Sequence, residues 1–133
     1  MSRSLEEKIR LVESYLRYLT EPDPQDETWD EFHELAVSDP RGAWEILLEV
    51  SRRCGDDDLA MLGAGAVQHL LFLHPGLAPE FEAQVRADDR FLKAFQYVAM
   101  TGVPLAVQQR LNAALADRGV DPKFLVEYDE EIE

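Results

Sequence analysis

The stretch Leu59-Ala-Met-Leu-Gly-Ala-Gly-Ala-Val-Gln-His-Leu-Leu-Phe-Leu73 is the most apolar in the chain, and its only strongly polar side chains are Gln68 and His69. Three aspartates stand directly before it, where they favour a helix N-terminus, and Pro75-Gly76 breaks the pattern after it. Because the apolar residues cover nearly every side of a helix, they predict a buried, central helix within residues 56–73. The stretch is shorter than the roughly 20 residues that a membrane-spanning helix needs.

Amphipathic helices are predicted on the N-terminal side of this stretch. Ser4 and Glu7 form a capping box at the start of a helix over residues 4–19, and a shorter helix over residues 28–37 follows a proline-containing loop. Asp39 and Pro40 mark the start of a third helix, which Gly55 is expected to end in the left-handed conformation. The expected inward-facing residues are Leu5, Ile9, Leu11, Val12, Tyr15, Leu16, Tyr18, Leu19, Trp29, Phe32, Leu35, Ala36, Ala43, Trp44, Ile46, Leu47, Leu48, Val50 and Cys54.

Shorter helices are predicted after the central stretch, over residues 79–87 and 89–100 and then from Pro104 to Gly119. Their expected core residues include Phe91, Leu92, Phe95, Val98, Ala99, Val107, Leu111, Ala114 and Leu115. Only residues 124–128 have extended character, and one short segment cannot form a sheet. The predicted fold is therefore all-α, an irregular bundle of about six or seven short helices in one domain over residues 1–119. A faint repeat, Asp39-Pro40-Arg41 and Asp88-Asp89-Arg90, suggests HEAT-like antiparallel hairpins as a variant.

The charge is strongly acidic, with 27 acidic against 13 basic side chains and a net charge of −14. This charge argues against nucleic acids and anionic membranes as partners, because both bind positive surfaces. The acidic side chains between positions 21 and 34 are either a solubilising surface or a docking face for a basic protein. For the docking face, the candidate contacts are Asp23, Asp26, Glu27, Trp29, Asp30, Glu31 and Glu34.

No motif for catalysis, a cofactor or a metal is complete. Asp30, His33 and Glu34 share a helix face, but neither His69 nor His74 has an acidic residue three positions before it, as a di-metal bundle requires. Both of these histidines are expected to hydrogen-bond a carbonyl or to lie at a helix end, rather than to shuttle protons. Cys54 is expected to be a packed, inert thiol, although neighbouring arginines could activate it.

Two glycines interrupt the central helix, where each costs about 1 kcal/mol relative to alanine. Gly63 and Gly65 predict the close approach of another helix, and a kink that lines a binding groove is the alternative. The single cysteine and the absence of a secretory apolar stretch at the N-terminus give the expectation of a cytoplasmic protein.

The C-terminal segment, residues 120–133, is predicted to be an acidic tail. Its apolar side chains at Phe124, Val126 and Tyr128 lead us to expect residues 124–128 to dock on the bundle. A wholly disordered tail and an acidic arm that enters a partner's basic groove are the alternatives.

Three blocks carry a resemblance to a known family: Ala43-Trp44-Glu45, the stretch from Leu62 to Leu71, and Asp89-Arg90-Phe91. In these blocks the chain resembles a family of small uncharacterised bacterial helical domains. That family favours Gly-Pro-Leu-Glu-Asp-Leu-Leu in the middle block, where Gly65, Leu70 and Leu71 match and residues 66–69 depart. The resemblance spans a little under half of the chain and implies an α-helical fold. It implies no activity, because the family's function is unknown.

These observations rank the candidate functions. An acidic protein-binding module comes first, in the form of an immunity or antidote protein that inhibits a basic partner. A non-catalytic scaffold or regulatory subunit of a bacterial complex is the alternative, with Trp29 as a hot spot if it is exposed. An enzyme ranks third, because its histidines or Cys54 would have to assemble in three dimensions. The sequence leaves the oligomeric state open.

Overall fold

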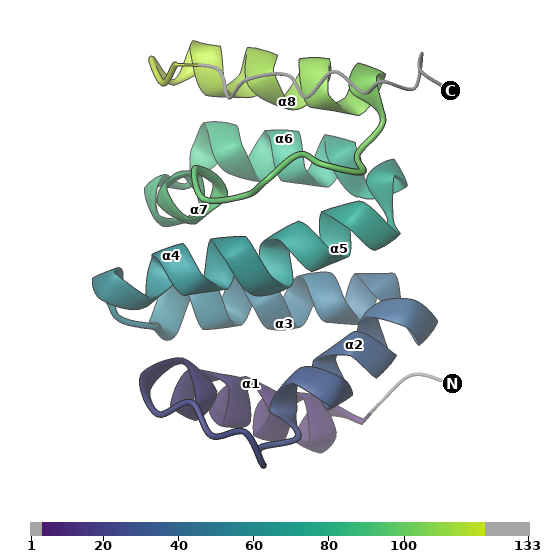
Figure 1. Cartoon of the computed structure of the whole chain (residues 1–133), viewed down its shortest axis with the longest axis vertical. Helices are drawn as coiled ribbons and strands as arrows, with labels where there is room; N and C mark the ends of the chain where they lie inside the picture. Colours follow the sequence, from purple (N-terminus) through teal and green to yellow (C-terminus); the bar gives the residue numbers. More distant parts are fainter. Residues whose placement is uncertain (1–3, 122–133) are drawn as a thin grey trace.

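The computed structural model describes residues 4–121, which form a stack of helices with α1 at one end and α8 at the other (Figure 1). The helices are α1 (Leu5–Thr20), α2 (Thr28–Ser38), α3 (Pro40–Arg53), α4 (Leu59–Leu62), α5 (Gln68–Leu73), α6 (Ala78–Ala87), α7 (Asp89–Phe95) and α8 (Leu105–Asp117). A π-helical turn, Gly63–Val67, joins α4 and α5 into one rod, which we call the central rod. The described residues contain no strand, so the all-α fold with about seven helices is confirmed.

Most helix ends lie where the capping residues predict them. The Ser4 hydroxyl accepts a hydrogen bond from the Glu7 amide at 3.2 Å, and the Glu7 carboxylate accepts one from the Ser4 amide at 3.1 Å. Asp39 accepts a bond from the Gly42 amide at the start of α3, and Gly119 follows α8 with a φ of 75°. The bonds at Ser4 and Asp39 satisfy backbone amides that a helix N-terminus leaves unpaired.

Two predictions near helix ends are wrong, the left-handed conformation of Gly55 and the length of the helix that starts at Asp89. Gly55 is extended, with φ −71° and ψ 158°, because α3 already ends at Arg53. The helix predicted over residues 89–100 stops at Phe95, and Ala99 is exposed rather than part of the core. After Phe95 the backbone forms tighter turns, in which the Tyr97 and Val98 amides donate to carbonyls three residues earlier at 3.0 Å. The Ala99 amide then donates to the Gln68 amide oxygen of the central rod at 2.9 Å. This bond replaces the helical bond that Ala99 would otherwise donate.

The central rod lies in the middle of the stack, as predicted. Leu62, Val67, Leu70 and Leu71 have no exposed surface. Its burial is not uniform, because Phe72 is 51% exposed. The rod is therefore buried on one side and open to solvent on the other.

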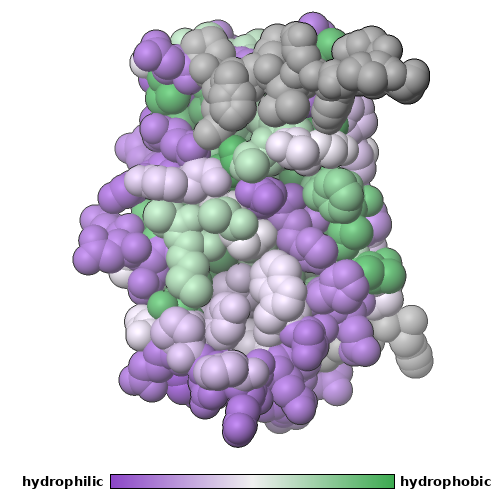
Figure 2. Space-filling view, in the orientation of Figure 1, coloured by the Kyte–Doolittle hydropathy of each residue, from purple (hydrophilic) through white to green (hydrophobic). Residues whose placement is uncertain are grey.

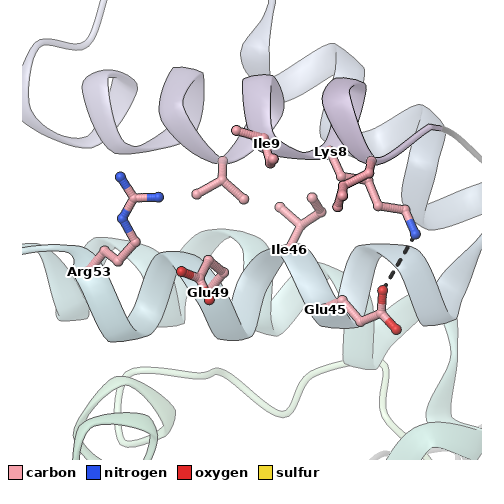
Figure 3. A pocket seen from close by; sticks show the side chains of 8 residues that line it. Lys8, Ile9, Glu45, Ile46, Glu49 and Arg53 are labelled. Atoms are coloured by element: carbon pink, nitrogen blue, oxygen red, sulfur yellow. Dashed lines mark hydrogen bonds and ion pairs between the residues drawn. The ribbon is translucent and has the colours of Figure 1, made fainter.

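The first helix is covered less than its apolar stripe predicts. Leu5 and Ile9 are 73% and 49% exposed, although both were expected to face the core. The side chains of α1 that do reach the core come from its later turns, from Leu11 to Leu19. The exposed start of α1 instead forms one wall of a groove against α3 (Figure 3).

Arginines tie neighbouring layers of the stack together. Arg90 of α7 donates to the Ser51 carbonyl at 2.8 Å and to the Cys54 carbonyl, at the C-terminal end of α3. Arg118, after α8, donates in the same way to the Val85 carbonyl at 2.9 Å, near the end of α6. Each guanidinium therefore satisfies carbonyls at the negative end of a helix in another layer.

The central rod and α7 approach each other closely at Gly63. A Cβ atom built at this position would lie 1.8 Å from the carbonyl oxygen of Ala94 in α7. The close approach of another helix, which was predicted at Gly63, is therefore confirmed. At Gly65 the nearest atoms, from Tyr15 and Trp29, would lie 3.6 and 3.8 Å from a Cβ, which is ordinary contact.

We predict opposite effects for alanine at these two glycines. Gly63→Ala forces the backbone of α7 to move and should lower the free energy of unfolding by about 3 kcal/mol. Gly65→Ala meets no clash, and it should raise the free energy of unfolding by up to about 1 kcal/mol because alanine favours helix. Urea denaturation of both variants checks this. Equal effects at the two positions would show that the Ala94 contact does not limit the packing.

Candidate functional site

Two histidines meet on the open side of the central rod. His33 of α2 and His69 of α5 lie 36 positions apart, and Nδ1 of His33 is 2.8 Å from Nε2 of His69. The Trp29 ring packs on His69, with ring centroids 5.1 Å apart. We call Trp29, His33 and His69 the histidine cluster.

The cluster lies between two surface hollows. The first has a volume of about 240 Å³ and is lined by Trp29, Ala64, Gly65, Gln68, His69, Phe72 and Thr101. The second, of about 390 Å³, is lined by His33, Glu34, Val37 and Ser38. Phe72 and Val37, one from each hollow, are both more than half exposed. The cluster is therefore flanked by space and by accessible apolar side chains.

The surroundings of His69 disfavour the charged form of its ring. The pKa of His69 is lowered from its usual value, chiefly because the ring is partly buried and further because His33 lies beside it. One ring nitrogen in the 2.8 Å contact must donate and the other must accept.

The predicted acidic contacts lie on the helix and loop next to the cluster. Asp23, Glu27, Asp30, Glu31 and Glu34 are all exposed. Figure 2 shows hydrophilic side chains gathered over the α1 and α2 end of the molecule, with apolar side chains above them. An acidic surface therefore adjoins the hollows.

Two predicted contact residues have structural roles as well. Asp26 is half-buried and accepts bonds from the Thr28 amide at 2.9 Å and the Thr28 hydroxyl at 2.6 Å. These bonds to Thr28 lower the pKa of Asp26 and fix the turn into α2. Trp29 is also half-buried, with part of its ring against the core and part against the first hollow.

The other candidate groups do not form a reactive site. His74 Nε2 lies 2.7 Å from the Ala36 carbonyl oxygen, which confirms the expected bond to a carbonyl. Cys54 is buried, and burial raises the pKa of its thiol despite the nearby Arg90. Among residues 4–121, no group of three or more His, Cys, Asp or Glu side chains is placed to hold a metal ion.

A separate groove lies between α1 and α3 (Figure 3). Its volume is about 250 Å³, and Leu5, Ile9 and Ile46 supply apolar walls. Lys8 and Glu45 form an ion pair across one end at 3.4 Å, and Glu49 and Arg53 lie toward the other end. The charged lining is therefore balanced, unlike the acidic surface near the histidine cluster.

The pairing of His33 with His69 was not predicted from the sequence. The only signal was the polar Gln68-His69 pair within an otherwise apolar helix. In the structure both side chains have partners, since Gln68 bonds the Ala99 amide and His69 bonds His33. The side chain that meets His33 is therefore a second histidine, which an acidic-x-x-His repeat does not predict.

Comparisons with protein-family models, curated proteins and solved structures found no match to this chain. The resemblance in the blocks around Trp44, Gly65 and Arg90 stays a prediction. Within the described residues, no helix is both long enough and apolar enough to cross a membrane. The predicted tail, with its docking segment 124–128, lies outside the described residues apart from Val120 and Asp121.

We predict that His69 makes stability depend on pH. Because its folded pKa is lowered, the unfolded chain binds the extra proton more readily as pH falls below the unfolded value of about 6.5. The free energy of unfolding should therefore rise with pH through this range, and the contribution of His69 should be complete above it. His69→Gln should flatten this rise in urea denaturation between about pH 5 and about pH 7.5. Parallel pH curves for the two proteins would contradict the prediction.

Proposed function

We propose that this chain is a protein-binding module that holds a basic partner on the face around the histidine cluster. The observation that carries the proposal is the position of Trp29, half-buried at the edge of a hollow and next to the exposed carboxylates of Asp30 and Glu31. Tryptophan in such a position is typical of the residues that dominate binding energy at protein interfaces.

The carboxylates and the hollow have different roles in this proposal. Exposed acidic side chains attract a positively charged surface over a distance of about 10 Å at moderate salt and raise the association rate. The first hollow, with Trp29 and Phe72 in its lining, offers a place for an apolar side chain of the partner. This combination suits an immunity or antidote protein, which must reach a basic enzyme surface quickly and then hold it.

A scaffold or regulatory subunit is the second candidate. The groove between α1 and α3 supports it, because Leu5 and Ile9 are largely exposed there and the charged lining is balanced. An amphipathic helix of another subunit fits such an apolar groove. The two candidates use different faces, so variants of each face separate them.

We predict that binding depends on charge and on Trp29 in different ways. The immobilised chain should capture a basic protein from an extract of its own cells, with retention that falls as salt is raised. With that partner purified, Glu31→Lys should slow association severalfold. Trp29→Ala should weaken binding by about 2 kcal/mol, or about thirtyfold in Kd, mainly through faster dissociation.

Asp57→Lys is the matched control for charge, because Asp57 is exposed and lies before α4, away from α5. It changes the net charge as much as Glu31→Lys does, and it should affect association less. A strongest partner that is acidic, or retention that does not change with salt, would contradict the proposal. Loss of binding in Ile9→Glu, with Trp29→Ala unaffected, would favour the scaffold.

A further inference from the structure

We propose that His33 and His69 together bind a divalent transition metal ion of the zinc class, with water in the remaining coordination positions. The proposal rests on the position of two imidazoles from different helices, and it stands independently of the proposed partner. The sequence does not predict this site, because His33 and His69 lie 36 positions apart.

The ring geometry is close to that of two zinc ligands. A zinc ion bonds histidine nitrogen at about 2.0–2.1 Å, so two ligands of a tetrahedral ion lie roughly 3.3 Å apart. In the structure, Nδ1 of His33 and Nε2 of His69 are 2.8 Å apart, and the ring centroids are 5.0 Å apart. For an ion to bind, the ring that donates in this contact must first change to its other neutral tautomer, with its proton on the nitrogen that faces away. Ring rotations that open the nitrogen contact by about 0.5 Å would then direct both lone pairs at one ion.

The surroundings favour a cation and leave room for water. Asp30 is three positions before His33, on the same side of α2, and Glu34 lines the hollow beside His33. These carboxylates make the local potential negative. The hollows on either side of the cluster leave space for water molecules on the ion.

The choice of metal follows from the ligands. Neutral imidazole suits zinc, copper and nickel, whereas magnesium and calcium prefer carboxylates and water. Because only two protein side chains hold the ion, the site is open and its metal exchanges, unlike a closed structural zinc site. A bound ion would link α2 to α5, two helices that meet through His33 and His69.

The test is titration of the untagged chain with Zn²⁺ by calorimetry near neutral pH. We expect one equivalent to bind and the melting temperature to rise with excess Zn²⁺. His33→Gln and His69→Gln should each weaken binding by at least about tenfold. His74→Gln is the matched control, since the chain has three histidines and His74 bonds the Ala36 carbonyl instead.

Mg²⁺ separates the histidine site from the acidic surface. Mg²⁺ should bind more weakly than Zn²⁺ and should not displace it, because Mg²⁺ prefers oxygen ligands. Cu²⁺ supplies a second readout, since binding at His69 should quench the fluorescence of the adjacent Trp29 and His69→Gln should remove this quenching. The proposal is overturned if Zn²⁺ does not bind, if His33→Gln binds it unchanged, or if Mg²⁺ competes equally.

Discussion

The contact between Gly63 and the Ala94 carbonyl sets how closely the central rod and α7 can approach. With a Cβ atom at 1.8 Å from that oxygen, α7 would have to move outward. This movement of α7 would also displace Phe91 and Phe95, which pack against other aromatic rings in the core. The ring centroid of Phe91 lies 5.6 Å from that of Trp44 in α3 and 6.0 Å from that of Phe81 in α6. One missing side chain therefore allows three helices to share a core.

The same rod connects this core to the candidate site. The π-helical turn begins at Gly63, and α5 follows directly with Gln68 and His69. Turns of this kind often occur at functional sites, because the extra residue in the turn changes where the following side chains point. On the open side, Gln68 fixes the loop after α7 and His69 meets α2. Packing on one side of the rod thus positions the polar groups on the other.

The sequence predicts best those features that local chemistry decides. Ser4, Asp39 and Gly119 act on backbone groups within a few residues, and each marks a helix end in the structure. The bond between Gln68 and the Ala99 amide and the pairing of His33 with His69 join residues more than 30 positions apart, which no local pattern specifies. The exposure of Leu5 and Ile9 could not be predicted either. An apolar stripe shows which side chains a helix can bury, but it does not show how far the neighbouring helix extends along it.

The arginine bonds between layers affect which part of the stack unfolds first. In a stack, each layer is held mainly by its neighbours, so stability spreads along one dimension and the end layers are the easiest to detach. At one end of the described stack, α8 packs mainly on α6, and Arg118 adds its bond to the Val85 carbonyl. At the other end, α1 packs on both α2 and α3 and is therefore held by two helices. The central rod has neighbours on both sides, in α3 and α7. Local unfolding should therefore begin at α8 and leave the face that carries Trp29 intact, so the two ends of the stack differ in hydrogen-exchange protection.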